Sequence, residues 1–184
     1  RELVQLDLLV AQGAAPERRD RLAAVLEQSD NATPVERGLT LALLGDWAIV
    51  TGDAATAADY YREAWRTLSM NPEVDVAGYF RKPTMIDFVP PLSPVDRNER
   101  SKRYTWAEIA LEFDVSASGL PSDVRVMTRD QRTASLQARY NRRMRETHFR
   151  PRLVAGEPVA TTNVRSTHYV RRYVENDEEE LAEE

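Results

Sequence analysis

The hydrophobic and polar positions along the chain change their period once, near the middle. Through residues 1–70 the apolar side chains recur every three or four positions, which predicts amphipathic α-helices. Thr33, with Glu36 three residues behind it, and Asp53 are helix-start signals. We therefore expect four helices arranged in two pairs, with the third helix ending at Gly52.

The second pair of helices resembles a tetratricopeptide repeat over residues 36–69. Small residues stand where two helices must approach closely, and an aromatic residue stands on the second helix. The residues that carry the resemblance are Leu41, Leu44, Gly45, Ala48, Ala57, Tyr61 and Ala64. Two pairs are fewer than the roughly three repeats that stabilise such an array. We therefore expect the helical domain, residues 1–70, to pack against the second domain or against residues upstream of Arg1; an unrelated helical hairpin is the alternative.

Residues 71–103 hold five of the ten prolines, which favour extended backbone and block helix. This segment is either a plain linker or a linker that contains one edge strand at Thr84–Val89.

From residue 104 onward apolar and polar positions alternate, which predicts strands that each bury one side. The first strand turns inward Ile109, Leu111, Phe113 and Val115, and turns toward solvent Glu108, Ala110, Glu112 and Asp114. After a turn at Gly119, a second strand that buries Val124 and Val126 returns as an antiparallel hairpin. The expected cross-strand pairs join Arg125 or Arg129 to Glu112 or Glu108.

Residues 133–147 return to a helical period, with Thr133 as the expected N-cap. The buried stripe of this helix is Leu136, Tyr140 and Met144. Its arginines are Arg139, Arg142, Arg143 and Arg145. They either complement the negative C-terminal end of the helix or offer a nucleic-acid site.

After the helix, Phe149 is expected to pack between helix and sheet, and Pro151 is expected to keep the helix from continuing. A turn over residues 155–158 leads to a long final strand. The fold class is therefore α+β, with N-terminal helical hairpins followed by a β-β-α-β antiparallel-sheet domain at 104–174 and an acidic tail at 175–184.

This second domain resembles the C-terminal domain of the TonB family. The shared features, in order, are a strand, a glycine turn, an S-D-V-x-V strand, a helix, F-x-P, G-x-P-V and a last strand. The matching residues are Phe113, Val115, Gly119, Ser122, Asp123, Val124, Val126, Phe149, Pro151, Gly156, Pro158 and Val159. Ser118 stands where the family often has an acidic residue or Asn, and the family's Tyr-Pro pair before the first strand is missing.

The resemblance implies a periplasmic protein-interaction module that works by β-strand addition, in TonB-dependent transport. An extended segment of an envelope or outer-membrane receptor protein would pair with the last strand. The side chains that would tune this binding are Asn163, Arg165, Thr167, Tyr169, Arg171 and Tyr173. Polar groups on both faces leave the register of this strand weakly specified, and a homodimer through the same edge is a further expectation. The alternative is that Arg171 and Arg172 protect the edge from pairing.

Charge is unevenly distributed along the chain. Residues 80–174 carry 18 basic and 10 acidic side chains, whereas the tail carries seven acidic side chains and no basic one. The basic block is either ordinary surface charge or a face that meets an acidic partner. We expect the tail to be disordered and to compete for the Arg-rich helix.

The residue inventory favours a binding protein over an enzyme. The chain has no cysteine, and its two histidines, His148 and His168, lie in separate elements without metal-ligand spacing. We therefore expect no catalytic residues, no cofactor and no metal. An RNA-binding α/β module that uses the Arg-rich helix is the alternative function. The net charge of −5 and an absence of exposed aromatic pairs on the strands argue against nucleic acid.

Compartment follows from the resemblance alone. The chain starts at Arg1 and contains no apolar stretch long enough to span a membrane. We expect a periplasmic location, with any tether to the inner membrane supplied by a segment upstream of Arg1.

Overall fold

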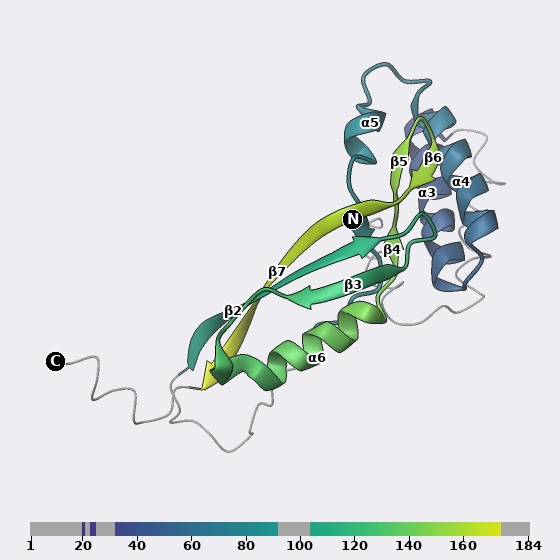
Figure 1. The fold of residues 1–184 in the computed structure, drawn as a ribbon. Helices are drawn as coiled ribbons and strands as arrows, with labels where there is room; N and C mark the ends of the chain where they lie inside the picture. Colours follow the sequence, from purple (N-terminus) through teal and green to yellow (C-terminus); the bar gives the residue numbers. More distant parts are fainter. Residues whose placement is uncertain (1–19, 21–22, 25–31, 92–103, 174–184) are drawn as a thin grey trace.

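The chain folds as a mixed α+β protein with antiparallel sheets, as expected from the sequence. The computed structural model describes residues 20, 23–24, 32–91 and 104–173. The first predicted helix pair, within residues 1–30, therefore lies largely outside the described residues, as do residues 92–103 and the acidic tail. Two helices stand at one end of a long twisted sheet, and the other end of the sheet points away from them (Figure 1).

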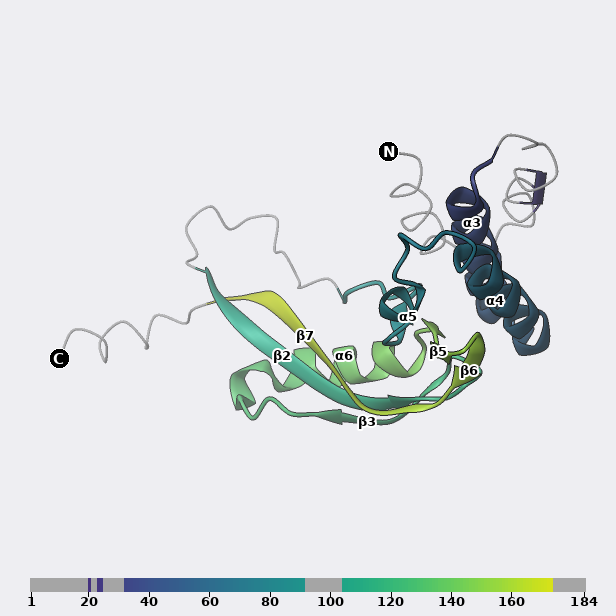
Figure 2. The same cartoon turned by 90° about the horizontal axis from the view of Figure 1, so that it is seen from above.

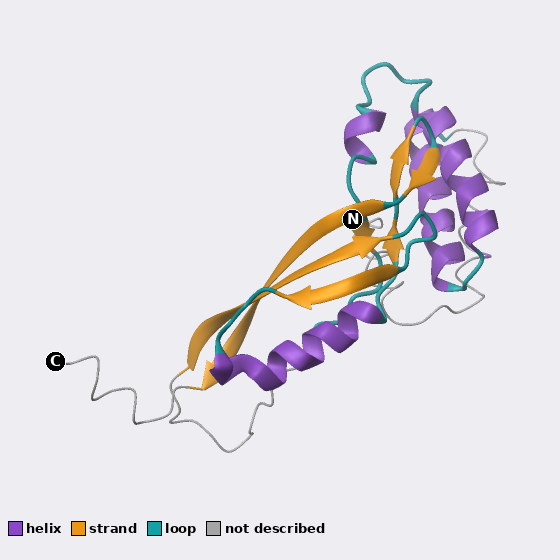
Figure 3. Cartoon of the chain, in the orientation of Figure 1, coloured by secondary structure: helices purple, strands orange, loops and turns teal. Residues whose placement is uncertain are grey.

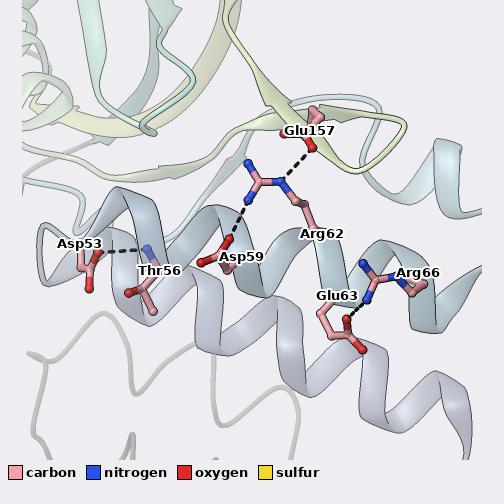
Figure 4. Close-up of polar contacts among 7 residues, drawn as sticks. All are labelled: Asp53, Thr56, Asp59, Arg62, Glu63, Arg66 and Glu157. Carbon is pink, nitrogen blue, oxygen red and sulfur yellow. Dashed lines mark hydrogen bonds and ion pairs between the residues drawn. The ribbon is translucent and has the colours of Figure 1, made fainter.

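The two helices are α3 (Pro34–Val50) and α4 (Ala54–Leu68), and both begin where the sequence predicts. At the start of α3, the Thr33 hydroxyl accepts the Glu36 N–H at 3.2 Å and the Glu36 carboxylate accepts the Thr33 N–H at 2.9 Å. At the start of α4, Asp53 accepts the Thr56 N–H at 3.0 Å (Figure 4). The predicted end of α3 is two residues late, because Gly52 lies in the turn with a φ of +82°.

The α3–α4 pair, called the helical hairpin below, buries the residues that the repeat-like pattern singles out. These are Leu41, Leu44, Ala48, Ala57, Tyr61 and Ala64. Gly45 is required at the crossing, because a Cβ there would overlap the Tyr61 ring. The close helix contact is therefore present, although a hairpin of this kind does not identify the repeat family.

The proline-rich segment after the hairpin is packed rather than free-standing. It contains α5 (Val76–Tyr79), and both Val76 and Phe80 are buried in the core of the helical hairpin. The expected strand at Thr84–Val89 is confirmed only for β1 (Thr84–Met85), which pairs with β4 (Phe149–Arg150). The segment is thus neither a plain linker nor a full edge strand.

The sheet has the strand order β3–β2–β7, and both pairings are antiparallel. Its parts are β2 (Tyr104–Val115), β3 (Pro121–Val126) and β7 (Thr161–Tyr173), with a 3-10 turn (Gln131–Thr133) and α6 (Ala134–Arg145) between β3 and β7. The four predicted inward residues of β2 are at most 1% exposed. They face α6, which runs along one face of the sheet and buries Leu136, Tyr140 and Met144 (Figure 2).

Three details of this domain correct the sequence interpretation. Thr133 precedes α6 but makes no side-chain cap bond, because its hydroxyl donates to the Asp130 carbonyl at 2.9 Å. The helix ends at Arg145, before it reaches Pro151. Glu112, expected on a solvent-facing side, is only 8% exposed.

A second hairpin, β5 (Arg152–Val154) and β6 (Glu157–Val159), packs the sheet domain against the helices (Figure 3). Leu153 is buried in the helical core, and its N–H donates to the Phe80 carbonyl at 3.1 Å. On the surface, the Arg62 guanidinium bonds Glu157 at 2.8 Å (Figure 4). As expected for an array this short, the helical hairpin leans on the second half of the chain.

A buried ion pair holds the two halves together. Arg150 of β4 donates from two nitrogens to the carboxylate of Asp46 on α3, with Nε at 2.8 Å from Oδ1, and both side chains are less than 10% exposed. Tyr61 donates to Asp46 at 2.9 Å, and Arg150 also donates to the Tyr79 hydroxyl at 2.9 Å. Burial opposes the charge of Arg150, but attraction to Asp46 outweighs it and raises the pKa of the guanidinium.

Candidate functional site

The free side of β7 is the candidate site. β7 is an outer strand of the three-stranded sheet, and within 32–91 and 104–173 no other strand pairs with the side that faces away from β2. This free side is called the β7 edge below. It belongs to a 13-residue strand, long enough to accept an added strand over many residues.

The direction of the main-chain groups on β7 follows from the contacts of β2. Ala110 turns toward β3, because its carbonyl accepts the Met127 N–H at 2.8 Å and its N–H donates to Thr128 Oγ1 at 2.8 Å. Main-chain groups alternate along a strand, so Ile109 and Leu111 turn toward β7.

The residues of β7 opposite Ile109 and Leu111 are His168 and Ser166, which therefore turn their main-chain groups back toward β2. By the same alternation, the neighbouring odd-numbered residues point their N–H and C=O groups to the β7 edge. These residues are Arg165, Thr167, Tyr169 and Arg171.

The six site residues expected from the sequence fall into three groups. Arg165, Thr167, Tyr169 and Arg171 share the face of the sheet opposite α6, called the outer face below, and are all exposed. Asn163 lies at the start of the strand in left-handed backbone, φ +55°, with its N–H bonded to Asp114 at 2.8 Å. Tyr173 pairs with Tyr104 at the last position of the register.

The inner face of β7, turned toward α6, is polar in composition but packed. Val170 is buried, and Val164, Ser166 and His168 are half-buried. The His168 ring stacks on Phe88 with ring centroids 4.7 Å apart, and its Nε2 lies 2.9 Å from Ser166 Oγ. Burial lowers the pKa of the His168 imidazole. Phe88 also lies 5.9 Å from the Tyr140 ring, so the proline-rich segment fills the gap between α6 and β7.

The outer face carries two exposed aromatic residues, which corrects the sequence interpretation that the strands lack them. Trp106 is 64% exposed and Tyr169 is 67% exposed. They are diagonal neighbours, because Trp106 lies opposite Arg171, two residues after Tyr169. The Arg171 guanidinium lies 5.4 Å from the centre of the Trp106 ring. Alternation along each strand points both side chains outward, but only the pairing register makes them neighbours.

The ion pair of Glu112 also differs from the expected one. Arg125 of β3 lies opposite Glu112 in the register, as expected, yet the carboxylate of Glu112 bonds Arg165 of β7 at 2.9 Å. Glu112 is buried by its neighbours, while the Arg165 side chain remains 76% exposed.

No protein-family model matches the chain, and no curated protein sequence matches it significantly. In the part of the chain that the structure describes, no helix has the length and apolar character needed to cross a membrane.

Proposed function

We propose that this protein is a protein-interaction module that binds an extended segment of a partner by strand addition to the β7 edge. The observation that carries the proposal is how main-chain and side-chain directions coincide along β7. The residues whose main-chain groups point to the edge are the same residues whose side chains are exposed on the outer face. An added strand would therefore meet both hydrogen-bonding groups and recognition side chains from Arg165, Thr167 and Tyr169.

The resemblance to the TonB C-terminal domain extends this proposal to a partner and a compartment. It supports a periplasmic module whose partner is an envelope or outer-membrane receptor protein, in TonB-dependent transport. Support comes from the order β2–β3–α6–β7, which is the order of that resemblance.

The test combines site-specific crosslinking with a blocking variant. A photo-crosslinking phenylalanine analogue replaces Tyr169 in the full chain, which is then exposed to Gram-negative envelope extract. Thr167→Pro, combined with the same crosslinker, removes an edge-pointing N–H without removing a bond to β2. We expect crosslinked partners that disappear with Thr167→Pro. The same crosslinker at the exposed Ser122 of β3 is the matched control and should capture none of them.

Amide hydrogen exchange reads the same edge directly. In the free chain the amides of Arg165, Thr167 and Tyr169 should exchange fast, and those of Ser166 and His168 slowly. A captured partner segment should slow the first set and leave the second unchanged. Partners that bind without protecting the odd-numbered amides would contradict strand addition.

Generic RNA is the probe for the alternative function. RNA binding is favoured by the exposed Trp106, Tyr169 and Arg171, since aromatic and guanidinium groups stack on bases. However, Glu108 and Glu112 lie on the same face, and α6 with its arginines covers the opposite face. Strong, salt-sensitive RNA binding that is lost in Trp106→Ala would overturn the peptide-binding proposal.

A further inference from the structure

The charges on the outer face are arranged in rows that follow the strands. β3 contributes Arg125, which lies opposite Glu112 of β2, and Glu112 lies opposite Arg165 of β7. β2 turns to this face the carboxylates of Glu108, Glu112 and Asp114. On the outer face β7 carries Arg165 and Arg171 and no acidic residue. Arg125, Glu112 and Arg165 therefore alternate in sign across the three strands.

We propose that the β7 edge selects an extended segment with acidic side chains at alternate positions. The inference rests on the proposed function, because it concerns the partner of the same edge. A strand added to β7 would lie about 4.8 Å from it, so its outward side chains stand beside Arg165 and Arg171. Opposite charges directly across a strand pair are favourable and like charges are not.

The exposure of the arginines allows this pairing. Arg165 bonds Glu112 through Nε at 2.9 Å, yet 76% of its side chain stays exposed, so the rest of the guanidinium faces solvent. Arg165 and Arg171 are six residues apart on one face, which sets a six-residue spacing between the two acidic positions of the partner. The partner's inward positions would lie beside Val164, Ser166, His168 and Val170.

A second copy of this chain fits the edge less well. Two β7 strands side by side would bring two strands with arginines and no carboxylate together, and thereby break the alternation of the rows. The acidic segment of another protein continues the alternation and is the occupant that the charges favour.

The test uses the full chain and three labelled twelve-residue peptides in fluorescence anisotropy. Each peptide alternates Thr or Val with Glu, Gln or Lys. At low salt we expect the Glu peptide to bind about tenfold more tightly than the Gln peptide, with the Lys peptide weakest; the difference should shrink as salt shortens the Debye length. Methylation of alternate amides in the Glu peptide should abolish its binding, since strand addition needs those N–H groups.

Two matched variants locate the preference. Arg171→Gln removes one positive charge from β7 and should reduce the preference for Glu over Gln by about threefold or more. Arg125→Gln removes the same charge from β3, two strands away, and should change the preference by less than about twofold because of screening. Equal effects of the two variants would show general charge attraction and overturn the inference.

The remaining outcomes separate the two proposals. Equal binding of the Glu and Gln peptides, abolished by amide methylation, would leave strand addition intact and overturn the acidic preference. Binding that ignores methylation, or no binding of any peptide, would overturn strand addition itself. A dimer in sedimentation that no peptide dissociates would show that a second copy occupies the edge.

Discussion

The sheet has two edges, and they are built differently. β3 is six residues long and starts with Pro121, which lacks an N–H. A register shift opposite Glu112 and Asp114 and a left-handed Asp123, φ +49°, distort it. The side-chain amide of Asn141 on α6 donates to the Val124 carbonyl at 3.1 Å and so occupies an edge acceptor. These are the devices that keep an edge from pairing.

β7 has few of these devices. It is 13 residues long, contains no proline, and pairs with β2 in unbroken register from Val164 to Tyr173. It shares with protected edges its arginines and, at its start only, a register shift and the left-handed Asn163. Edge protection is therefore selective: β3, the edge strand beside α6, is protected from pairing, whereas the β7 edge is regular over most of its length. A protein under pressure only to avoid aggregation would be expected to blunt both.

The largest effect that we expect comes from removing the buried ion pair that joins the sheet domain to the helical hairpin. Asp46→Ala leaves the Arg150 guanidinium buried without its carboxylate, and we expect the free energy of unfolding to fall by about 3–5 kcal/mol. Denaturant unfolding followed by circular dichroism measures it. The matched control, Glu157→Gln, removes the exposed partner of Arg62 and should lower the free energy of unfolding far less, because solvent screens this pair. Equal costs would show that burial of the pair is not what matters.

Proline at two adjacent positions tests which residues of β7 point their N–H groups to the free edge. Ser166→Pro removes an N–H that points to β2 and should lower the free energy of unfolding by about 2–4 kcal/mol. Thr167→Pro removes an N–H that points to the edge, and we expect a cost below about 1.5 kcal/mol. Thermal and denaturant unfolding of both variants decides the order. A reversed order would mean that the even-numbered groups form the edge.

Asn141→Ala tests how β3 is protected. Loss of its bond to the Val124 carbonyl should cost about 1 kcal/mol of stability. Because Pro121 and the distorted backbone remain, we expect no new peptide binding at β3 by amide exchange. Arg145→Gln is the control, since it removes only the Arg145 bond to Asn141. Strand addition at β3 after Asn141→Ala would show that a single amide protects that edge.

The smallest effect that we expect is a pH dependence of β7. The folded-state pKa of His168 is lowered from 6.5 by burial, so the unfolded chain binds the proton more tightly. The stabilising contribution is fully present above pH 6.5 and declines as the pH falls below it toward the folded-state value. Unfolding midpoints from pH 8 to pH 5 should decline less in His168→Gln than in the wild type. An identical decline would assign the pH dependence to other groups.

Features that depend on neighbouring residues were predictable from the sequence. The starts at Thr33 and Asp53 and the buried stripe of α6 are local, because a cap or a helical face involves residues a few positions apart. The alternation of β2 is equally local, which is why its four inward residues were predicted correctly.

Features that depend on distant partners were not predictable. Asp46 and Arg150 are 104 residues apart, and Glu112 and Arg165 are 53 apart, so no spacing rule joins them. The inner face of β7 is polar in sequence yet packed, because Phe88, which stacks on His168, comes from a segment 80 residues earlier.

The candidate edge shows the same division within one strand. The odd-numbered side chains follow from a two-residue period, which is a property of any extended chain. Whether their N–H and C=O groups point to β2 or to the free edge depends on the hydrogen-bonding register between β2 and β7. Long-range pairing sets that register. Local conformation is specified by adjacent side chains, whereas an edge exists only once a sheet has formed around it.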